Sequence, residues 1–286
     1  MITMNFAVRN LKIFFRDRAA VFFSLLSAFI IIGLYVLFLG DMLTGNMKSI
    51  PNSRFLLDSW IMAGLLSVTS ITTTMGAFGI MVEDKAKKIS KDFSASPAKR
   101  SSLAGGYIVS SFIIGLIMTC ITFVLAELYI VAYGGKVLGA ASLVKLFGVM
   151  LLSVSSSTAL VLFIVSFFKS NNAFATASTI LGTLIGFLTG VYIPIGSLPE
   201  AVQAVVKFFP VSHASVLFRQ VMMESPLQTA FAGAPAMASR EFRQMMGVSF
   251  QWGVTELSVA VSLWVLVGTA VVFFLLATWN LSRKRK

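Results

Sequence analysis

The sequence predicts an all-α integral membrane protein, and its composition and its long apolar runs support this fold class. Hydrophobic residues make up 57% of the 286 residues and charged residues only 12%, with a mean hydropathy of +0.89. Such a chain has too little polar surface to cover a soluble globule. Apolar runs of about 18 residues or more can each cross a hydrocarbon core of about 30 Å. The six predicted spans are 19–39, 59–82, 105–131, 143–168, 174–195 and 257–279.

The distribution of basic residues predicts the orientation of the spans. With six crossings both termini lie on one side, and 15 of the 23 Lys and Arg residues fall there. Loops rich in Lys and Arg stay cytoplasmic, so we expect both termini in the cytoplasm. The basic residues flank apolar spans instead of forming a stripe with exposed aromatic residues. The net charge of +12 therefore indicates anionic lipid headgroups and not nucleic acid.

Several kinds of chemistry are missing from the chain. One cysteine, Cys120, and one histidine, His213, cannot supply a Cys/His nucleophile pair or a multi-histidine metal site. The only Gly-Lys pair, Gly135-Lys136, is followed by Val137, so the sequence lacks a phosphate-binding loop. We predict no catalytic, cofactor or metal site in this chain, and an energy source that another chain supplies.

Residues 1–18 predict an amphipathic helix that lies flat at the membrane surface. Arg9, Lys12 and Arg16 fall on one face, while Phe6 and Phe14 point toward the other. The aromatic rings would enter the acyl chains and the cations would stay at the headgroups. The alternative is a plain cytoplasmic extension of the first span.

The second span is unusually rich in hydroxyl side chains, which leaves two interpretations open. Ser and Thr can bond to carbonyls of their own helix, so they can serve packing alone. They can also line a polar path between helices. The candidates for such a path, including two threonines of the fifth span, are Ser67, Ser70, Thr73, Thr74, Thr179 and Thr183.

The fifth span carries glycines at four-residue intervals, Gly182, Gly186 and Gly190. This spacing predicts a stripe without side chains on which another helix, of this or another subunit, packs closely.

In the third span, Glu127 lies about 6 Å below the outer boundary, within reach of headgroup water. Contact of Glu127 with a transported molecule is the alternative, and His213 is expected to be a satisfied loop residue.

The region 196–255 predicts a helical outer loop between the fifth and sixth spans. Ser197 and Glu200 form a capping-box pattern at the start of a helix that ends before Pro210. A second short helix from Ser212 would dip back toward the membrane. The Ala-, Pro- and Gly-rich portion 224–239 is expected to be irregular.

The cytoplasmic segment 83–104 collects six basic residues between two spans. Residues 85–95 predict a short helix on which Ile89 and Phe93, four positions apart, form an apolar pair with a charged rim of Lys88, Lys91 and Asp92. Such a pair suits the groove of a partner protein. The alternative is a solvated basic loop attracted to anionic lipid.

The layout and two local patterns resemble the permeases of the ABC type-2 exporter family over essentially the whole chain. In that family a segment beginning with acids and ending in a Ser/Thr-Pro turn couples the second span to an ATPase, and Glu83, Asp84 and Ser96-Pro97-Ala98-Lys99-Arg100 resemble it. One departure is that Ala86-Lys87-Lys88 stands where the family commonly has Gly-Thr. The second pattern, after the fifth span, is Gly190, Pro194, Pro199, Pro210 and Arg219.

The resemblance implies a single permease domain, residues 1–286, in a bacterial plasma membrane. It implies a dimer of permeases, each resting on a cytoplasmic ATPase subunit that binds ATP and Mg²⁺. The cargo would be a small amphipathic or hydrophobic molecule, such as a drug or antibiotic, moved outward. Alternatives are export of a lipid, glycan, peptide or ion, a lipid-modifying membrane enzyme, and an autonomous channel or carrier. The residues expected to couple to the ATPase are Glu83, Asp84, Lys88, Ile89, Lys91, Asp92 and Phe93.

Overall fold

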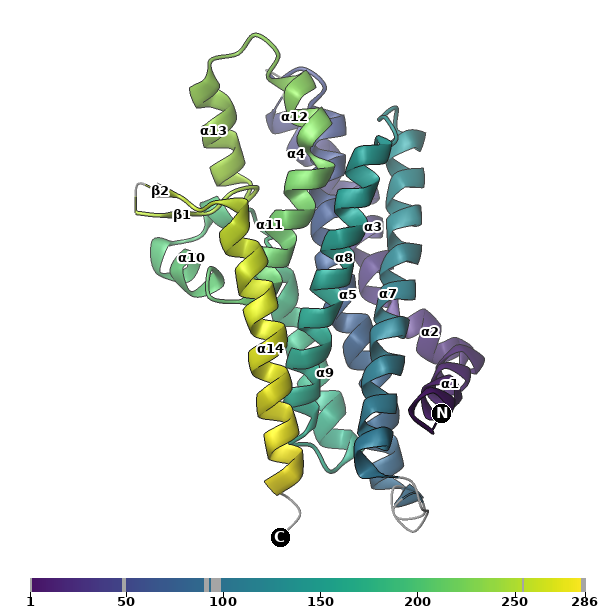
Figure 1. Cartoon of the computed structure of the whole chain (residues 1–286). Helices are drawn as coiled ribbons and strands as arrows, with labels where there is room; N and C mark the ends of the chain where they lie inside the picture. The colour runs from purple at the N-terminus through teal and green to yellow at the C-terminus, as the bar shows by residue number, and fades with distance from the viewer. Residues whose placement is uncertain (1, 48–49, 90–92, 94–98, 254, 284–286) are drawn as a thin grey trace.

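The computed structural model describes residues 2–47, 50–89, 93, 99–253 and 255–283. Its long helices run side by side (Figure 1). Four of these helices are long and apolar enough to cross a membrane. They are α5 (Ser53–Ala86), α7 (Arg100–Ala132), α8 (Ala140–Val165) and α14 (Val259–Arg283). Helices α5 and α7 contain the predicted spans 59–82 and 105–131, whereas the predicted spans 143–168 and 257–279 extend two or three residues beyond α8 and α14.

The predicted first span is a bent helix. The helical stretch Arg18–Ser24 meets Leu26–Met42 at 43°, and the pair together is apolar and long enough for one crossing. Within this stretch the chain forms α2 (Arg18–Ser24), α3 (Leu26–Leu34), the π-helical turn η1 (Tyr35–Leu39) and α4 (Gly40–Asn46).

The predicted fifth span, 174–195, differs from the structure. Helix α9 (Asn171–Leu188) ends seven residues earlier, because Gly190 adopts a left-handed conformation with φ 69°. The chain then forms α10 (Glu200–Val206) and turns by 90° into α11 (Pro210–Met222), and this pair is a further candidate span. The described chain therefore holds four to six candidate membrane spans.

Much of the region 196–255 is helical, its position outside the membrane stays a prediction, and two details of the prediction were wrong. Residues 224–230 and 236–239 are helical instead of irregular, and only the connection 231–235 lies outside a helix. Helix α10 has Pro199 at its N-cap without a side-chain hydrogen bond, so the capping box of Ser197 and Glu200 is not formed. The remaining elements are the 3-10 turn η2 (Ile195–Ser197), α12 (Glu224–Ala230), α13 (Ala236–Met245) and the antiparallel hairpin of β1 (Gln251–Trp252) and β2 (Thr255–Glu256).

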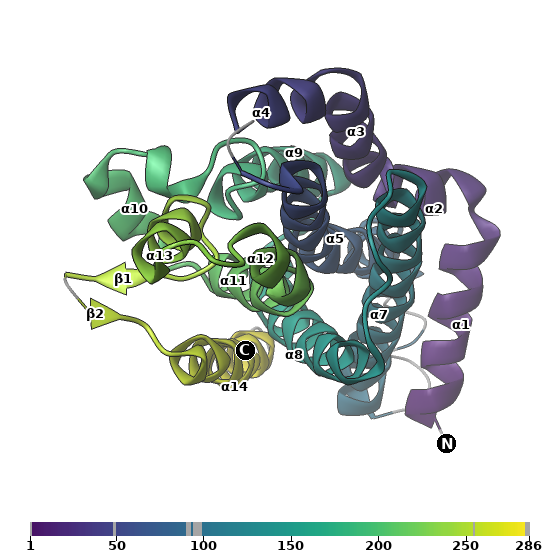
Figure 2. The same ribbon diagram turned by 90° about the horizontal axis from the view of Figure 1, so that it is seen from above.

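Helix α5 is the centre of the bundle. Within its apolar stretch 83% of the residues are buried, against 17% for α14. Seen from above, α5 is surrounded by α3, α7, α8, α9 and α11 (Figure 2). The small and hydroxyl side chains of α5 permit this close packing, and α14 leaves its apolar side chains facing outward, as a helix does in lipid.

Helix α1 (Ile2–Arg16) lies across the bundle: Figure 1 shows it nearly end-on and Figure 2 along its length. The predicted helix is present, and its position at a membrane surface stays a prediction. Its buried face, which includes Phe6 and Phe14, packs on α7 and not into acyl chains. The contact is close because Gly106 has no side chain between the two helices.

Gly106→Leu is expected to displace α1. A Cβ atom at position 106 would lie 2.6 Å from Cδ1 of Phe6 and 3.2 Å from the carbonyl oxygen of Thr3. Overpacking of this kind costs about 1–3 kcal/mol, so thermal unfolding in detergent should begin at a lower temperature. Gly268→Leu is the control, because a Cβ there meets nothing within 4 Å. Equal melting temperatures for the two variants would contradict this account.

Candidate functional site

A polar network joins α1 to the adjoining ends of α5 and α7. Arg9 donates two hydrogen bonds to Asp84, Nη1 to Oδ2 at 2.7 Å and Nη2 to Oδ1 at 3.0 Å. The Tyr107 hydroxyl donates to Oδ2 of Asp84 at 2.6 Å. Asn10 accepts from Arg9 at 2.9 Å and donates to Ser110 Oγ at 3.2 Å. These five residues, the Asp84 network, hold three helices in one arrangement.

The charges within the Asp84 network are balanced. The Asp84 side chain is 5% exposed and that of Arg9 is 31% exposed. The hydrogen bonds to Asp84 raise the pKa of Arg9 above its ordinary value, so Arg9 stays protonated. A two-point pair between guanidinium and carboxylate also fixes the relative orientation of the two side chains.

Phe93, one of the predicted coupling residues, contacts this network. Its ring packs edge-on against Phe6 at 5.1 Å, and the guanidinium carbon of Arg9 lies 5.1 Å from the centre of the Phe93 ring. The other member of the predicted apolar pair, Ile89, is partly buried. The structure therefore links the predicted coupling segment to α1 through Phe93.

The other predicted coupling residues fall at different places. Glu83 and Asp84 belong to α5, which continues to Ala86, and Glu83 forms a surface ion pair with Lys87. Lys88 follows in a left-handed conformation with φ 62° and is exposed. Lys91 and Asp92 lie outside the described residues, as do residues 90, 94 and 95 of the predicted helix 85–95. The start of that prediction was wrong, because α5 continues to Ala86 and the left-handed Lys88 interrupts the helix.

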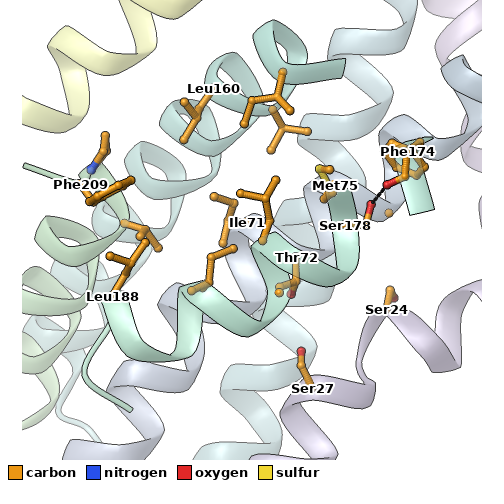
Figure 3. A pocket seen from close by; sticks show the side chains of 18 of the residues that line it. Ser24, Ser27, Ile71, Thr72, Met75, Leu160, Phe174, Ser178, Leu188 and Phe209 are labelled. Carbon is orange, nitrogen blue, oxygen red and sulfur yellow. Dashed lines mark hydrogen bonds between the residues drawn. The ribbon is translucent and has the colours of Figure 1, made fainter. Parts of the chain in front are cut away.

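A cavity of about 720 Å³, here called the α9 cavity, lies between α9 and the rest of the bundle. In Figure 3, Phe174, Ser178 and Leu188 belong to α9. Its walls are completed by α1, α2, α3, α5, α8, α11 and α14 and by the chain before α11. The cavity is open enough and large enough for a small molecule, since ligand sites occupy about 300–1,000 Å³.

The walls of the α9 cavity are almost entirely apolar. Five hydroxyl side chains line it, and those of Ser24, Thr72, Ser178 and Thr269 each donate their proton to a carbonyl of their own helix; the fifth is that of Ser27. None of the described residues that line it is charged. A charged molecule would lose its hydration here without compensation, whereas an apolar one would not. The cavity therefore suits hydrophobic or weakly polar ligands.

The six hydroxyl residues predicted to line a path lie outside the described lining of this cavity. Ser67, Ser70, Thr73 and Thr74 are buried and donate to carbonyls of α5, and Ser70 also bonds to Ser153 Oγ at 2.8 Å. Thr179 and Thr183 are exposed on α9 and donate to carbonyls of their own helix. Within one chain the four residues of α5 serve packing, and a path along the exposed threonines stays a prediction.

The three glycines of the predicted stripe have different surroundings. Gly182 lines the α9 cavity, and a Cβ there would meet nothing within 4 Å. Gly186 packs against the ring of Tyr192 from the chain that follows α9. Gly190 lies beyond the helix end. Packing of a second subunit along this helix stays a prediction.

Two further ionisable residues, Glu127 and His213, lie outside the Asp84 network, and the Oε1 atom of Glu127 is buried without a hydrogen-bond partner among the described residues. Glu127 accepts a hydrogen bond from the backbone N–H of Leu138 at 3.2 Å. His213 lies in α11 and not in a loop, with Nδ1 3.0 Å from Ser262 Oγ and Nε2 2.8 Å from the carbonyl oxygen of Lys207. Both ring nitrogens are therefore engaged. Among the described residues no group of three His, Cys, Asp or Glu side chains could hold a metal ion.

Sequence reasoning missed most of the Asp84 network. Arg9 was read only as a headgroup-facing cation, and Tyr107 was not singled out. Asn10 could have been noticed, because it lies four residues from both Phe6 and Phe14 and so shares their buried helix face. Tyr107 carries no such signal, since its partner Asp84 lies 23 positions away across a loop.

Comparison with known proteins places these features in a family. The model of the ABC-2 family transporter proteins matches residues 46–279, from the chain just before α5 into α14. No curated protein matches the chain. The multi-pass helical bundle agrees with the membrane component of such a transporter. The chain belongs to the ABC-2 family of transporter proteins.

Proposed function

We propose that this permease exports a small hydrophobic or amphipathic molecule and that a separate ATPase subunit drives it. The observation that carries the choice of cargo is the α9 cavity, whose described lining contains no charged residue. Peptides, glycans and ions would need polar partners that this wall does not offer. The cavity is also bordered by α2, α9 and α14, whose outward sides are rich in exposed apolar residues.

The energy would enter at the cytoplasmic end. The sequence lacks a phosphate-binding loop, so ATP and Mg²⁺ would bind to the partner ATPase. That subunit would dock where the chain between α5 and α7 meets α1, near Phe93 and the exposed Lys88. Because the Asp84 network connects α1, α5 and α7, a movement of the docked ATPase subunit at this point would displace the three helices as one rigid body.

The same proposal includes the direction of transport and the arrangement of the permease subunits. The basic residues favour a cytoplasmic position for both termini, and transport away from the ATPase would then be export. A second permease copy would pack on the exposed side of α9, where Ile180, Leu184 and Phe187 point outward. Such a contiguous apolar face is typical of a helix that lies in lipid or at a subunit interface.

Filling the α9 cavity is the direct test of the proposed cargo site. In Gly182→Phe the new side chain enters free space, because a Cβ at this position meets nothing within 4 Å. We expect ATP-dependent uptake of a hydrophobic fluorescent dye into inside-out vesicles to fall at least fivefold, with assembly with the ATPase unchanged. The vesicles contain the permease co-expressed with its ATPase.

The matched control is Gly268→Phe, on α14, where a Cβ also meets nothing within 4 Å but no described cavity is lined. It should transport the dye at the rate of the unmodified protein. Dye uptake without the ATPase would contradict the proposed energy source. Uptake by Gly182→Phe at the unmodified rate would contradict the proposed site.

A further inference from the structure

A second cavity, here called the α13 cavity, lies at the opposite end of the bundle from the C-terminus. It has a volume of about 1080 Å³ and is enclosed by α8, α11, α12, α13 and α14. No described residue lines both this cavity and the α9 cavity. Its volume lies just above the usual range of ligand sites, about 300–1,000 Å³. The transport proposal leaves this second site unused.

The polar part of the α13 cavity contains hydrogen-bonding groups without partners. The Nε of Arg243 and the Oε1 of Gln220 are buried and make no hydrogen bond to any residue that the structure describes. Arg243 also forms no ion pair within the described part of the chain. Buried donors and acceptors normally have partners, so the unused capacity here points to a bound ligand.

The charges around the α13 cavity favour a ligand with one negative charge. At the rim, Lys145 donates to Glu224 at 3.2 Å, and these two charges cancel. The guanidinium of Arg243 is then left as one net positive charge in the described lining. A planar guanidinium binds a phosphate through two parallel hydrogen bonds. The free Oε1 of Gln220 needs a donor, such as a hydroxyl group, in the same ligand.

The rest of the cavity is apolar and lies where two candidate membrane spans begin. Val149, Leu217 and Leu263 form its wall, from α8, α11 and α14. Beside it, on the same two membrane helices, Val144 is 75% exposed and Trp264 72% exposed. A tryptophan at this level is typical of the boundary between hydrocarbon and headgroups. The exposed Trp264 thus indicates that the cavity lies near the level of the lipid headgroups.

We propose that the α13 cavity binds an anionic phospholipid whose headgroup carries a hydroxyl group. The phosphate lies on Arg243, the hydroxyl donates to Oε1 of Gln220, and an acyl chain follows the wall of Val149, Leu217 and Leu263. The bound lipid holds the segment α11–α13 against α8 and α14. This assignment is independent of the cargo and of the ATPase.

The test measures lipid binding to the purified full-length chain in neutral detergent. Thermal unfolding is followed with increasing phosphatidylglycerol, which is anionic and carries hydroxyls, or phosphatidylcholine, which is neutral overall and lacks them. We expect at least tenfold tighter apparent binding of phosphatidylglycerol. Arg243→Gln should reduce this preference to less than threefold. Arg240→Gln, on the same helix but exposed and outside the cavity lining, should keep it.

A second variant keeps the charge and fills the apolar part. A Cβ at Gly148, which lines the cavity, meets nothing within 4 Å, so Gly148→Phe should fold and bind phosphatidylglycerol at least tenfold more weakly. Unchanged binding in Arg243→Gln, or an equal loss in Arg240→Gln, would overturn the proposal. Competition between phosphatidylglycerol and the exported dye would also overturn it, because the cavity would then be a cargo site.

Discussion

Asp84→Ala is expected to abolish ATP-driven transport and to lower the free energy of unfolding by about 2–3 kcal/mol. The substitution removes the acceptor for both guanidinium hydrogen bonds of Arg9 and for the hydroxyl of Tyr107. The cost is placed below the range for a fully buried pair because Arg9 is 31% exposed and can recover part of its hydration. Transport is lost because α1 then no longer moves with α5 and α7.

Glu83→Gln is the matched control, since it removes the neighbouring acid of the same helix. Its partner Lys87 is exposed, and surface ion pairs contribute about 0–1 kcal/mol. Glu83→Gln should therefore melt within about 2 °C of the unmodified protein. Because Glu83 is itself a predicted coupling residue, this variant is a control for stability and not for transport. Both variants are measured by thermal unfolding in detergent, and by dye uptake and ATP hydrolysis in the assembled transporter.

The double variant Arg9→Ala with Asp84→Ala shows how much of the loss in stability comes from the contact between these two side chains and how much from their other contacts. If the two side chains act mainly on each other, the double variant should be no less stable than Asp84→Ala alone. Additive losses would show that each side chain acts independently. ATP hydrolysis that continues without dye uptake in Asp84→Ala would support a role in coupling. Full dye uptake in this variant would refute that role.

Apolar length was the most informative property of the sequence. It located α5, α7, α8 and α14, because a membrane helix must supply about 20 consecutive apolar residues whatever its neighbours are. It failed at residues 174–195, where the apolar run continues past the end of α9. The helix ends there through the backbone conformation of Gly190, and a hydropathy pattern does not contain that information.

The candidate site was harder to predict because its parts meet only in three dimensions. The hydroxyls of α5 were visible in the sequence, but their partners were not. Ser70 meets Ser153, which is 83 positions away, and Thr72 is the member that faces the α9 cavity. A dense row of hydroxyls indicates a closely packed helix, and the neighbouring helices decide which side chain faces a cavity.

Arg219 was noticed only through the family resemblance, and the structure gives it a physical role. It is 0% exposed, and its Nη2 and Nη1 lie 3.2 Å and 3.4 Å from the carbonyl oxygens of Gly190 and Gly247. Its guanidinium carbon lies 4.7 Å from the ring centre of Trp60, whose Nε1 donates to the carbonyl oxygen of Met246 at 2.6 Å. Arg219 thus connects α5 and α11 to the chain that follows α9 and α13.

Both carbonyl acceptors belong to glycines with positive φ, 69° at Gly190 and 64° at Gly247. These conformations bring the two carbonyls toward the same guanidinium, and side chains at either position would strain the backbone. A Cβ at Gly64 of α5 would also lie 3.0 Å from Nη2 of Arg219. The three glycines therefore leave space for a planar cation that forms several hydrogen bonds. A shorter side chain, or one whose charged group is not planar, cannot replace it.

Arg219→Ala is expected to lower the free energy of unfolding by about 3–5 kcal/mol, from the lost volume and the two unpaired carbonyls. Most of the protein should then aggregate on extraction, as measured by size-exclusion chromatography of a fluorescent fusion. Arg219→Met, which fills the volume without donors, should lose less, and Arg240→Ala, at an exposed position, should behave as the unmodified protein. If Arg219→Ala and Arg240→Ala elute alike and melt within about 2 °C of each other, the guanidinium does not hold these segments together.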